Sequence, residues 1–147
     1  MTTTRRTVLL AITAALFVFG SVTMAAAPRP ALDKMMGMAK STITNVTVAQ
    51  ADQMGKMFPN MVWVDVRTGS EWSAGHIPGA VHIDRGLLEF RAETVLPDKS
   101  AKILIYCKSG GRGTLATKTL MDMGYTDVRN MAGGYTEWAK AGKPTQM

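Results

Sequence analysis

The chain has 147 residues, of which 46% are hydrophobic and 19% are charged. This length allows one domain with a genuine core, and the composition excludes a disordered chain. The formal net charge is +6, and it becomes +4 without Arg5 and Arg6, when 15 basic residues face 11 acidic ones. Because these charges are scattered, they argue against nucleic acid as a partner and favour small anions.

The first 26 residues are typical of a secretory signal peptide. Arg5 and Arg6 make the start basic, an apolar run of 13 residues covers 8–20, and small residues fill 21–27. This run is shorter than the roughly 20 residues that span a bilayer. We therefore expect residues 1–26 to be removed and the mature protein to be periplasmic or secreted from a bacterium. Only an uncleaved segment would place the protein at a membrane, and the paired arginines leave both general and twin-arginine export open.

Residues 27–41 are predicted to be a linker without fixed structure. Its middle is rich in methionine, with Met35, Met36 and Met38 close together. Thioethers are ligands for copper, but no histidine or second cysteine joins this cluster. Incidental methionines in a mobile or loosely packed segment explain it better, so no metal is expected.

Residues 42–147 are predicted to form the domain, because strand-like and helix-like segments alternate along them. The expected strands are 43–48, 61–66, 80–83, 102–106 and 128–131. The expected helices are 49–57, 70–74 with Ser70 as its cap, 87–95, 113–123 stopped by Gly124, and 135–141. This alternation predicts a doubly wound α/β fold, with a mostly parallel sheet covered by helices on both faces. Ligands of such sheets bind beyond the carboxyl ends of the strands.

Cys107, the only cysteine in the chain, directly follows the predicted central strand 102–106. Exported proteins usually pair their cysteines in disulfides, so a lone thiol is either buried and inert or kept for its reactivity. The loop that follows it is Lys108, Ser109, Gly110, Gly111 and Arg112. Backbone amides, a helix amino terminus and two cations would stabilise a thiolate there. We predict that Cys107 is a nucleophile and that residues 108–112 form its anion cradle.

Charged residues also gather at the end of the predicted strand 61–66. Asp65, Arg67 and Glu71 are expected to form an ionic network that supports the site and could orient Arg112, without a direct catalytic role. His76 is expected to bind the backbone of its own turn, although a role as general base stays open.

Four motifs over residues 42–144 resemble the rhodanese-like sulfurtransferases. They are Val64-Asp65-Val66-Arg67 with Glu71-Trp72, Gly75-His76-Ile77-Pro78-Gly79-Ala80, the Cys107–Arg112 loop, and Gly124-Tyr125 through Gly133-Gly134 and Trp138. The resemblance implies a persulfide on Cys107, a donor such as thiosulfate, and a cyanide, thiol or protein acceptor. It implies no metal or organic cofactor. Gly113 departs from the family, since many relatives have serine at this position.

Loop length bears on the type of reaction. Four residues separate Cys107 from Arg112. The resemblance implies that this size suits a sulfane sulfur, whereas related phosphatases and arsenate reductases use one residue more. We therefore expect a thiosulfate sulfurtransferase that works by ping-pong transfer. A persulfide carrier loaded by a partner protein is an alternative, as is a cysteine-dependent phosphatase or arsenate reductase.

Overall fold

The computed structural model describes residues 27–147, so the predicted signal peptide, 1–26, lies outside the described residues. Five parallel strands form one sheet in the order β1-β5-β4-β2-β3. The strands are β1 (Thr44–Val46), β2 (Val62–Asp65), β3 (Val81–His82), β4 (Lys102–Tyr106) and β5 (Asp127–Met131). The predicted α/β fold with a parallel central sheet is confirmed.

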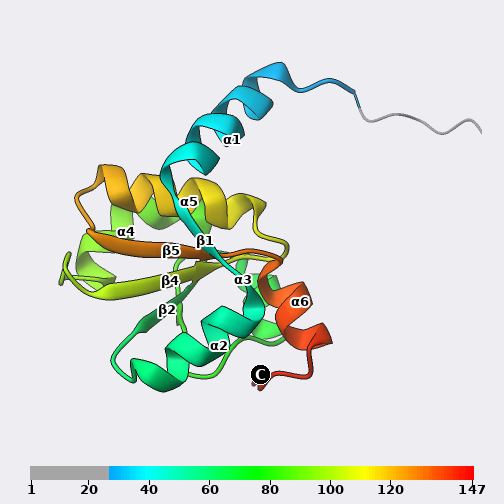
Figure 1. Ribbon diagram of the computed structural model, residues 1–147, viewed down its shortest axis with the longest axis vertical. Coiled ribbons are helices and arrows are strands. Elements are labelled where there is room, and N and C mark those ends of the chain that lie inside the picture. Colours follow the sequence, from blue (N-terminus) through cyan, green and yellow to red (C-terminus); the bar gives the residue numbers. More distant parts are fainter. Residues whose placement is uncertain (1–26) are drawn as a thin grey trace, which may run out of the picture.

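Helices cover both faces of the sheet, as Figure 1 shows. They are α1 (Pro30–Thr42), α2 (Val48–Met57), α3 (Gly69–Ser73), the 3-10 turn η1 (Arg85–Leu87), α4 (Leu88–Val95), α5 (Gly111–Asp122) and α6 (Gly134–Lys140). Helices α4 and α5 pack on one face, and α2 and α6 pack on the other (Figure 1). None of the helices within residues 27–147 has both the length and the apolar character that a membrane-spanning helix needs.

Strand β4 is the centre of the core because both of its faces are covered. Side chains alternate along a strand, so Ile103 and Ile105 join the cluster under α4 and α5, while Leu104 and Tyr106 join the cluster under α2 and α6. All four are fully buried. The strand therefore delivers Cys107, its next residue, to the middle of the carboxyl edge of the sheet.

The prediction that residues 27–41 lack fixed structure was wrong. Residues 30–42 form helix α1, which starts at Pro30 and packs on α5 with Ala39 buried. Proline suits the first helical position, and Ala, Leu, Lys and Met are good helix formers. Leu32, Met36 and Ala39 recur at helical spacing and are the least exposed side chains of α1, so the pattern of an amphipathic helix was present although the clustered methionines suggested a linker.

Two predicted helix starts also needed correction. Helix α5 begins at Gly111 instead of residue 113, because Gly110 adopts the left-handed conformation with φ +100° and serves as its amino-terminal cap. Helix α3 is capped by Thr68 and not by Ser70. The Thr68 hydroxyl accepts a hydrogen bond from the Glu71 N–H at 3.3 Å, and the Glu71 carboxylate accepts one from the Thr68 N–H at 3.1 Å.

Candidate active site

Cys107 lies directly beyond β4 and is only 1% exposed. Its Sγ accepts a hydrogen bond from the backbone N–H of Gly110 at 3.1 Å. The left-handed conformation of Gly110 turns the chain back toward the sulfur, a conformation that glycine adopts without steric cost. The loop thus already holds the sulfur with one of its own amides.

Helix α5 adds further backbone donors at the end of this loop. Its first backbone hydrogen bond runs from Thr114 N to Gly110 O at 2.8 Å. The N–H groups of Gly111, Arg112 and Gly113 precede that bond and so have no partner inside the helix. Together with the helix dipole, these N–H groups make the amino-terminal end of α5 favourable for a thiolate or another anion.

Helix α6 fixes the same loop from outside. The Tyr135 N–H donates to Cys107 O at 2.7 Å, and the Thr136 N–H donates to Lys108 O at 3.0 Å. Gly134 makes this approach possible, since a Cβ at its position would lie 2.3 Å from Cys107 O. Helix α6 therefore holds the carbonyl groups of Cys107 and Lys108, and so fixes the backbone conformation at the start of the loop.

Arg112, the last residue of the loop, forms a two-pronged ion pair with Glu71 of α3. Its Nη1 and Nη2 donate to the two carboxylate oxygens at 2.7 Å and 2.9 Å. Hydrogen bonding to Arg112 lowers the pKa of Glu71 from its ordinary value of 4.5 to about 2. Glu71 also completes the cap of α3, so a single carboxylate joins that helix to the active-site loop.

Asp65 and Arg67 form a separate, buried pair. Arg67 Nη2 donates to Asp65 Oδ2 at 2.6 Å and to Gly75 O at 2.7 Å, and its guanidinium lies 4.0 Å from the centre of the Tyr135 ring. Within residues 27–147 no hydrogen bond links this pair to Arg112. The predicted network is thus two pairs: Asp65 and Arg67 brace the turn after β2, and Glu71 alone holds Arg112.

His76 binds the backbone of its own turn on one side and the carboxyl-terminal segment on the other. Its Nε2 accepts from the Gln146 side-chain amide at 3.0 Å, so Nδ1 carries the proton and donates to Trp72 O at 3.2 Å. The ring also stacks on Trp72, with 3.5 Å between centroids. Both ring nitrogens are occupied, which leaves no free position for a general base.

Lys108 and Ser109, which follow Cys107 in the loop, are both exposed. Lys108 forms no ion pair with any residue of 27–147, in contrast to Arg112. Those same residues contain no group of three or more His, Cys, Asp or Glu side chains that could hold a metal ion.

Sequence reasoning missed Asn130, whose side chain lies under the start of α5. It is 1% exposed, and its Nδ2 donates to Asn45 Oδ1 at 2.8 Å and to Thr114 Oγ1 at 3.3 Å. A Cβ at Gly113 would lie 2.2 Å from Asn130 Oδ1, so a serine there would require Asn130 to move. Its alternation with Val128, which places both side chains on the buried face of β5, was the available signal.

The Glu71 pair gives a pH-dependent prediction. Since the pKa of Glu71 is about 2 in the folded protein and near 4.5 when unpaired, its contribution to stability is complete above about pH 4.5 and disappears as the pH falls toward 2. Glu71→Gln is expected to lower the free energy of unfolding by about 1 kcal/mol at pH 7, because a quarter of the side chain is exposed and solvent screens the pair.

Urea denaturation at pH 7, 4 and 2.5 measures this effect. The difference between wild type and Glu71→Gln should shrink at the lowest pH. Glu93→Gln, which removes an exposed pair with Lys99, is the control and should have a smaller effect at pH 7. A difference for Glu71→Gln that is constant across this range would show that ionisation of Glu71 is not what stabilises α3 and the loop.

Known proteins resemble this chain in sequence and in fold. Residues 47–141 match the rhodanese-like domain family. The chain is 36% identical over 94 residues to thiosulfate sulfurtransferase 16, chloroplastic, of Arabidopsis thaliana, covering 57% of this chain and 78% of that one. It is 35% identical over 71 residues to thiosulfate sulfurtransferase PspE of Escherichia coli, covering 48% and 68%.

Solved structures have a similar fold. A Rhodopseudomonas palustris protein, described as of unknown function and a possible tyrosine phosphatase, superposes with a TM-score of 0.74 at 32% identity, over 84% of this chain and 99% of that one. A thiosulfate sulfurtransferase from Pseudomonas aeruginosa shares the fold, with a TM-score of 0.68 at 19% identity over 78% of this chain and 22% of that one. The chain therefore belongs to the rhodanese-like sulfurtransferase family.

Proposed function

We propose that this protein is an exported thiosulfate sulfurtransferase that carries sulfur as a persulfide on Cys107. The observation that carries the proposal is the hydrogen bond from Gly110 N–H to Cys107 Sγ, inside a loop of four residues that ends at Arg112. The names of the Arabidopsis and Escherichia coli relatives support thiosulfate as the donor. A thiosulfate:glutathione sulfurtransferase of Saccharomyces cerevisiae, 33% identical over 100 residues, supports a thiol as acceptor.

The reaction has two steps that return the enzyme to its starting state. The Cys107 thiolate attacks the outer sulfur of thiosulfate, so that a new S–S bond forms, the old one breaks, and sulfite leaves with the electron pair. Cyanide or a thiolate then attacks the outer sulfur of the persulfide and releases the Cys107 thiolate. Charge balances in each step, and the amides at the start of α5 stabilise the sulfur anions.

The loop carries two cations, Lys108 and Arg112, and only Arg112 forms an ion pair within the described residues. Arg112 is paired with Glu71, so part of its charge is already neutralised. Lys108 is exposed and is therefore the cation available to attract dianionic thiosulfate. Export is part of the proposal and rests on residues 1–26 of the sequence.

Replacing Lys108 with glutamine is expected to raise the KM for thiosulfate about three- to fivefold, with a smaller change in kcat, since an exposed charge contributes at most about 1 kcal/mol. Steady-state kinetics at two ionic strengths check this, and the difference should shrink in high salt. Lys118→Gln is the matched control, because Lys118 pairs with Asp122 at the far end of α5. Equal KM changes in both variants would contradict a specific role for Lys108.

The test of the proposed function is intact mass after exposure to thiosulfate, combined with turnover of thiosulfate and cyanide. We expect a gain of one sulfur atom, its removal by cyanide, and rapid release of thiocyanate. Slow turnover, with the gain in mass only when a partner protein is present, would favour the persulfide carrier. Hydrolysis of aryl phosphates by this loop would instead indicate phosphatase chemistry and contradict both sulfur functions.

A further inference from the structure

A cleft of about 330 Å³ opens between helix α1 and the active-site loop. Met36 and Lys40 line it from α1, and the segment 109–111 lines it from the loop. This volume is at the lower end of the range for small-molecule sites. Helix α1 precedes residues 47–141, which match the family, so one wall of the cleft lies outside that match.

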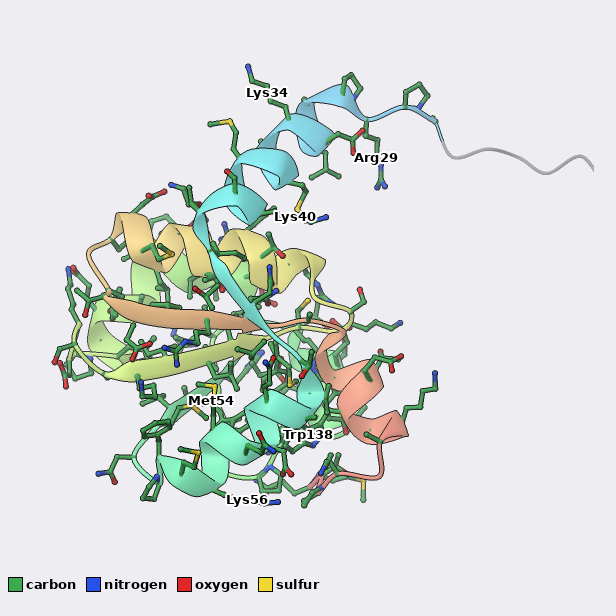
Figure 2. The ribbon with its side chains drawn as sticks, in the orientation of Figure 1. Arg29, Lys34, Lys40, Met54, Lys56 and Trp138 are labelled. Carbon is green, nitrogen blue, oxygen red and sulfur yellow. The ribbon has the colours of Figure 1, made fainter. Side chains whose placement is uncertain are left out.

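The cleft is suited to an anion. Lys40 is the one charged residue in its lining, and it forms no ion pair with other residues of the described chain. Figure 2 shows Lys40 at the end of α1 that lies against α5, whereas Lys34 projects from the opposite end of the same helix, away from the domain. The two lysines therefore share a helix and a charge but differ in their position relative to the cleft.

Hydrogen-bonding groups accompany this charge. Asn45 and Asn130 both line the cleft, and the Asn45 side-chain oxygen is already taken by Asn130 Nδ2. Nothing within residues 27–147 accepts from the Asn45 amide nitrogen, which is therefore available to a ligand. The Asn130 Oδ1, in contrast, is buried and faces Gly113, so it is not available to a ligand. A lysine and an amide donor suit a ligand with carboxylate groups.

Gly110 belongs both to the lining of the cleft and to the loop that holds the Cys107 sulfur. It lines the cleft and its N–H holds Cys107 Sγ, so a molecule bound there lies beside the residue that holds the sulfur. We infer that the cleft binds the sulfur acceptor, a low-molecular-weight thiol that carries carboxylate groups. This inference rests on the proposed function. The acceptor thiolate would attack the outer sulfur of the Cys107 persulfide, form its own persulfide, and release the Cys107 thiolate, with charge conserved.

Acceptor selectivity tests this inference, with thiosulfate as donor and with glutathione or uncharged 2-mercaptoethanol as acceptor. In Lys40→Glu, the ratio of kcat/KM for glutathione to that for 2-mercaptoethanol should fall about five- to tenfold, because a reversed charge repels the glutathione carboxylates. This loss should shrink in high salt. Lys34→Glu is the matched control and should keep the wild-type ratio.

A binding measurement separates the cleft from the proposed function. Calorimetry with S-methylglutathione, which cannot accept sulfur, is performed on Cys107→Ser and on Cys107→Ser with Lys40→Glu. Binding that depends on Lys40 would support the cleft even if the wild type fails to use thiosulfate. An unchanged acceptor ratio in Lys40→Glu, or binding that ignores Lys40, would overturn the inference. The inference would also be overturned if Lys40→Glu slowed sulfur transfer only to a protein thiol and not to glutathione.

Discussion

Replacing Cys107 with serine is expected to lower thiosulfate turnover by at least about a thousandfold and to abolish the gain in mass after thiosulfate exposure. A serine hydroxyl does not ionise near neutral pH and cannot form a persulfide. Its oxygen can still accept the hydrogen bond that Gly110 N–H donates to Sγ in the wild type. The substitution therefore removes the reacting atom and preserves the shape of the loop.

Stability is the control for this loss. Cys107 is buried but small, so Cys107→Ser should change the free energy of unfolding by only about 1 kcal/mol if the hydroxyl keeps its partner. Urea denaturation measures this, and steady-state kinetics and intact mass measure the chemistry. Turnover above about 1% of the wild-type rate in a folded Cys107→Ser protein would show that another group carries the sulfur.

Strand β4 shows what local sequence could predict. The predicted strand 102–106 matches the observed strand at both ends, because a continuous apolar run buried on both faces leaves few alternatives. Since the predicted strand ends at Tyr106, it also predicted that Cys107 lies at the carboxyl edge of the sheet. Helix α5 was less predictable, since Gly110 and Gly111 favour a loop by composition while the structure uses the first as a cap and the second as a helical residue.

Contacts between segments that are distant in the chain could not be predicted from local sequence. Glu71 and Arg112 are 41 positions apart, and their pairing depends on how α3 packs beside the loop. The charged residues could be grouped near the site, but not divided into their two pairs. Helix α1 was missed for a different reason: Leu32, Met36 and Ala39 recur at helical spacing, but the polar ends and clustered methionines of this segment are also typical of a linker.

The contact between α6 and the active-site loop gives the second large expected effect. Gly134 has φ +58°, and a Cβ there would lie 2.3 Å from Cys107 O and 2.8 Å from the Lys108 carbonyl carbon. These are backbone atoms, which cannot rotate aside as a side chain can. Gly134→Ala is therefore expected to lower the free energy of unfolding by about 3–5 kcal/mol, from the collision together with the strain of a left-handed alanine.

Gly142→Ala separates these two causes. Gly142 has a similar φ of +66°, but no atom of the described residues, apart from its chain neighbours, lies within 4 Å of where its Cβ would stand. It should therefore show the conformational strain alone, about 1–2 kcal/mol, in the same urea denaturation measurement. Similar losses in the two variants would contradict a collision at Gly134.

Activity adds a second criterion, because α6 holds the loop through the Tyr135 and Thr136 amides. An alanine at Gly134 must push α6 and the start of the loop apart, and this moves the carbonyl groups of Cys107 and Lys108 that those amides bind. Folded Gly134→Ala should therefore transfer sulfur at least about tenfold more slowly than wild type, whereas Gly142→Ala should not. Slow transfer in Gly134→Ala alone would show that α6 positions the nucleophile as well as stabilising the fold.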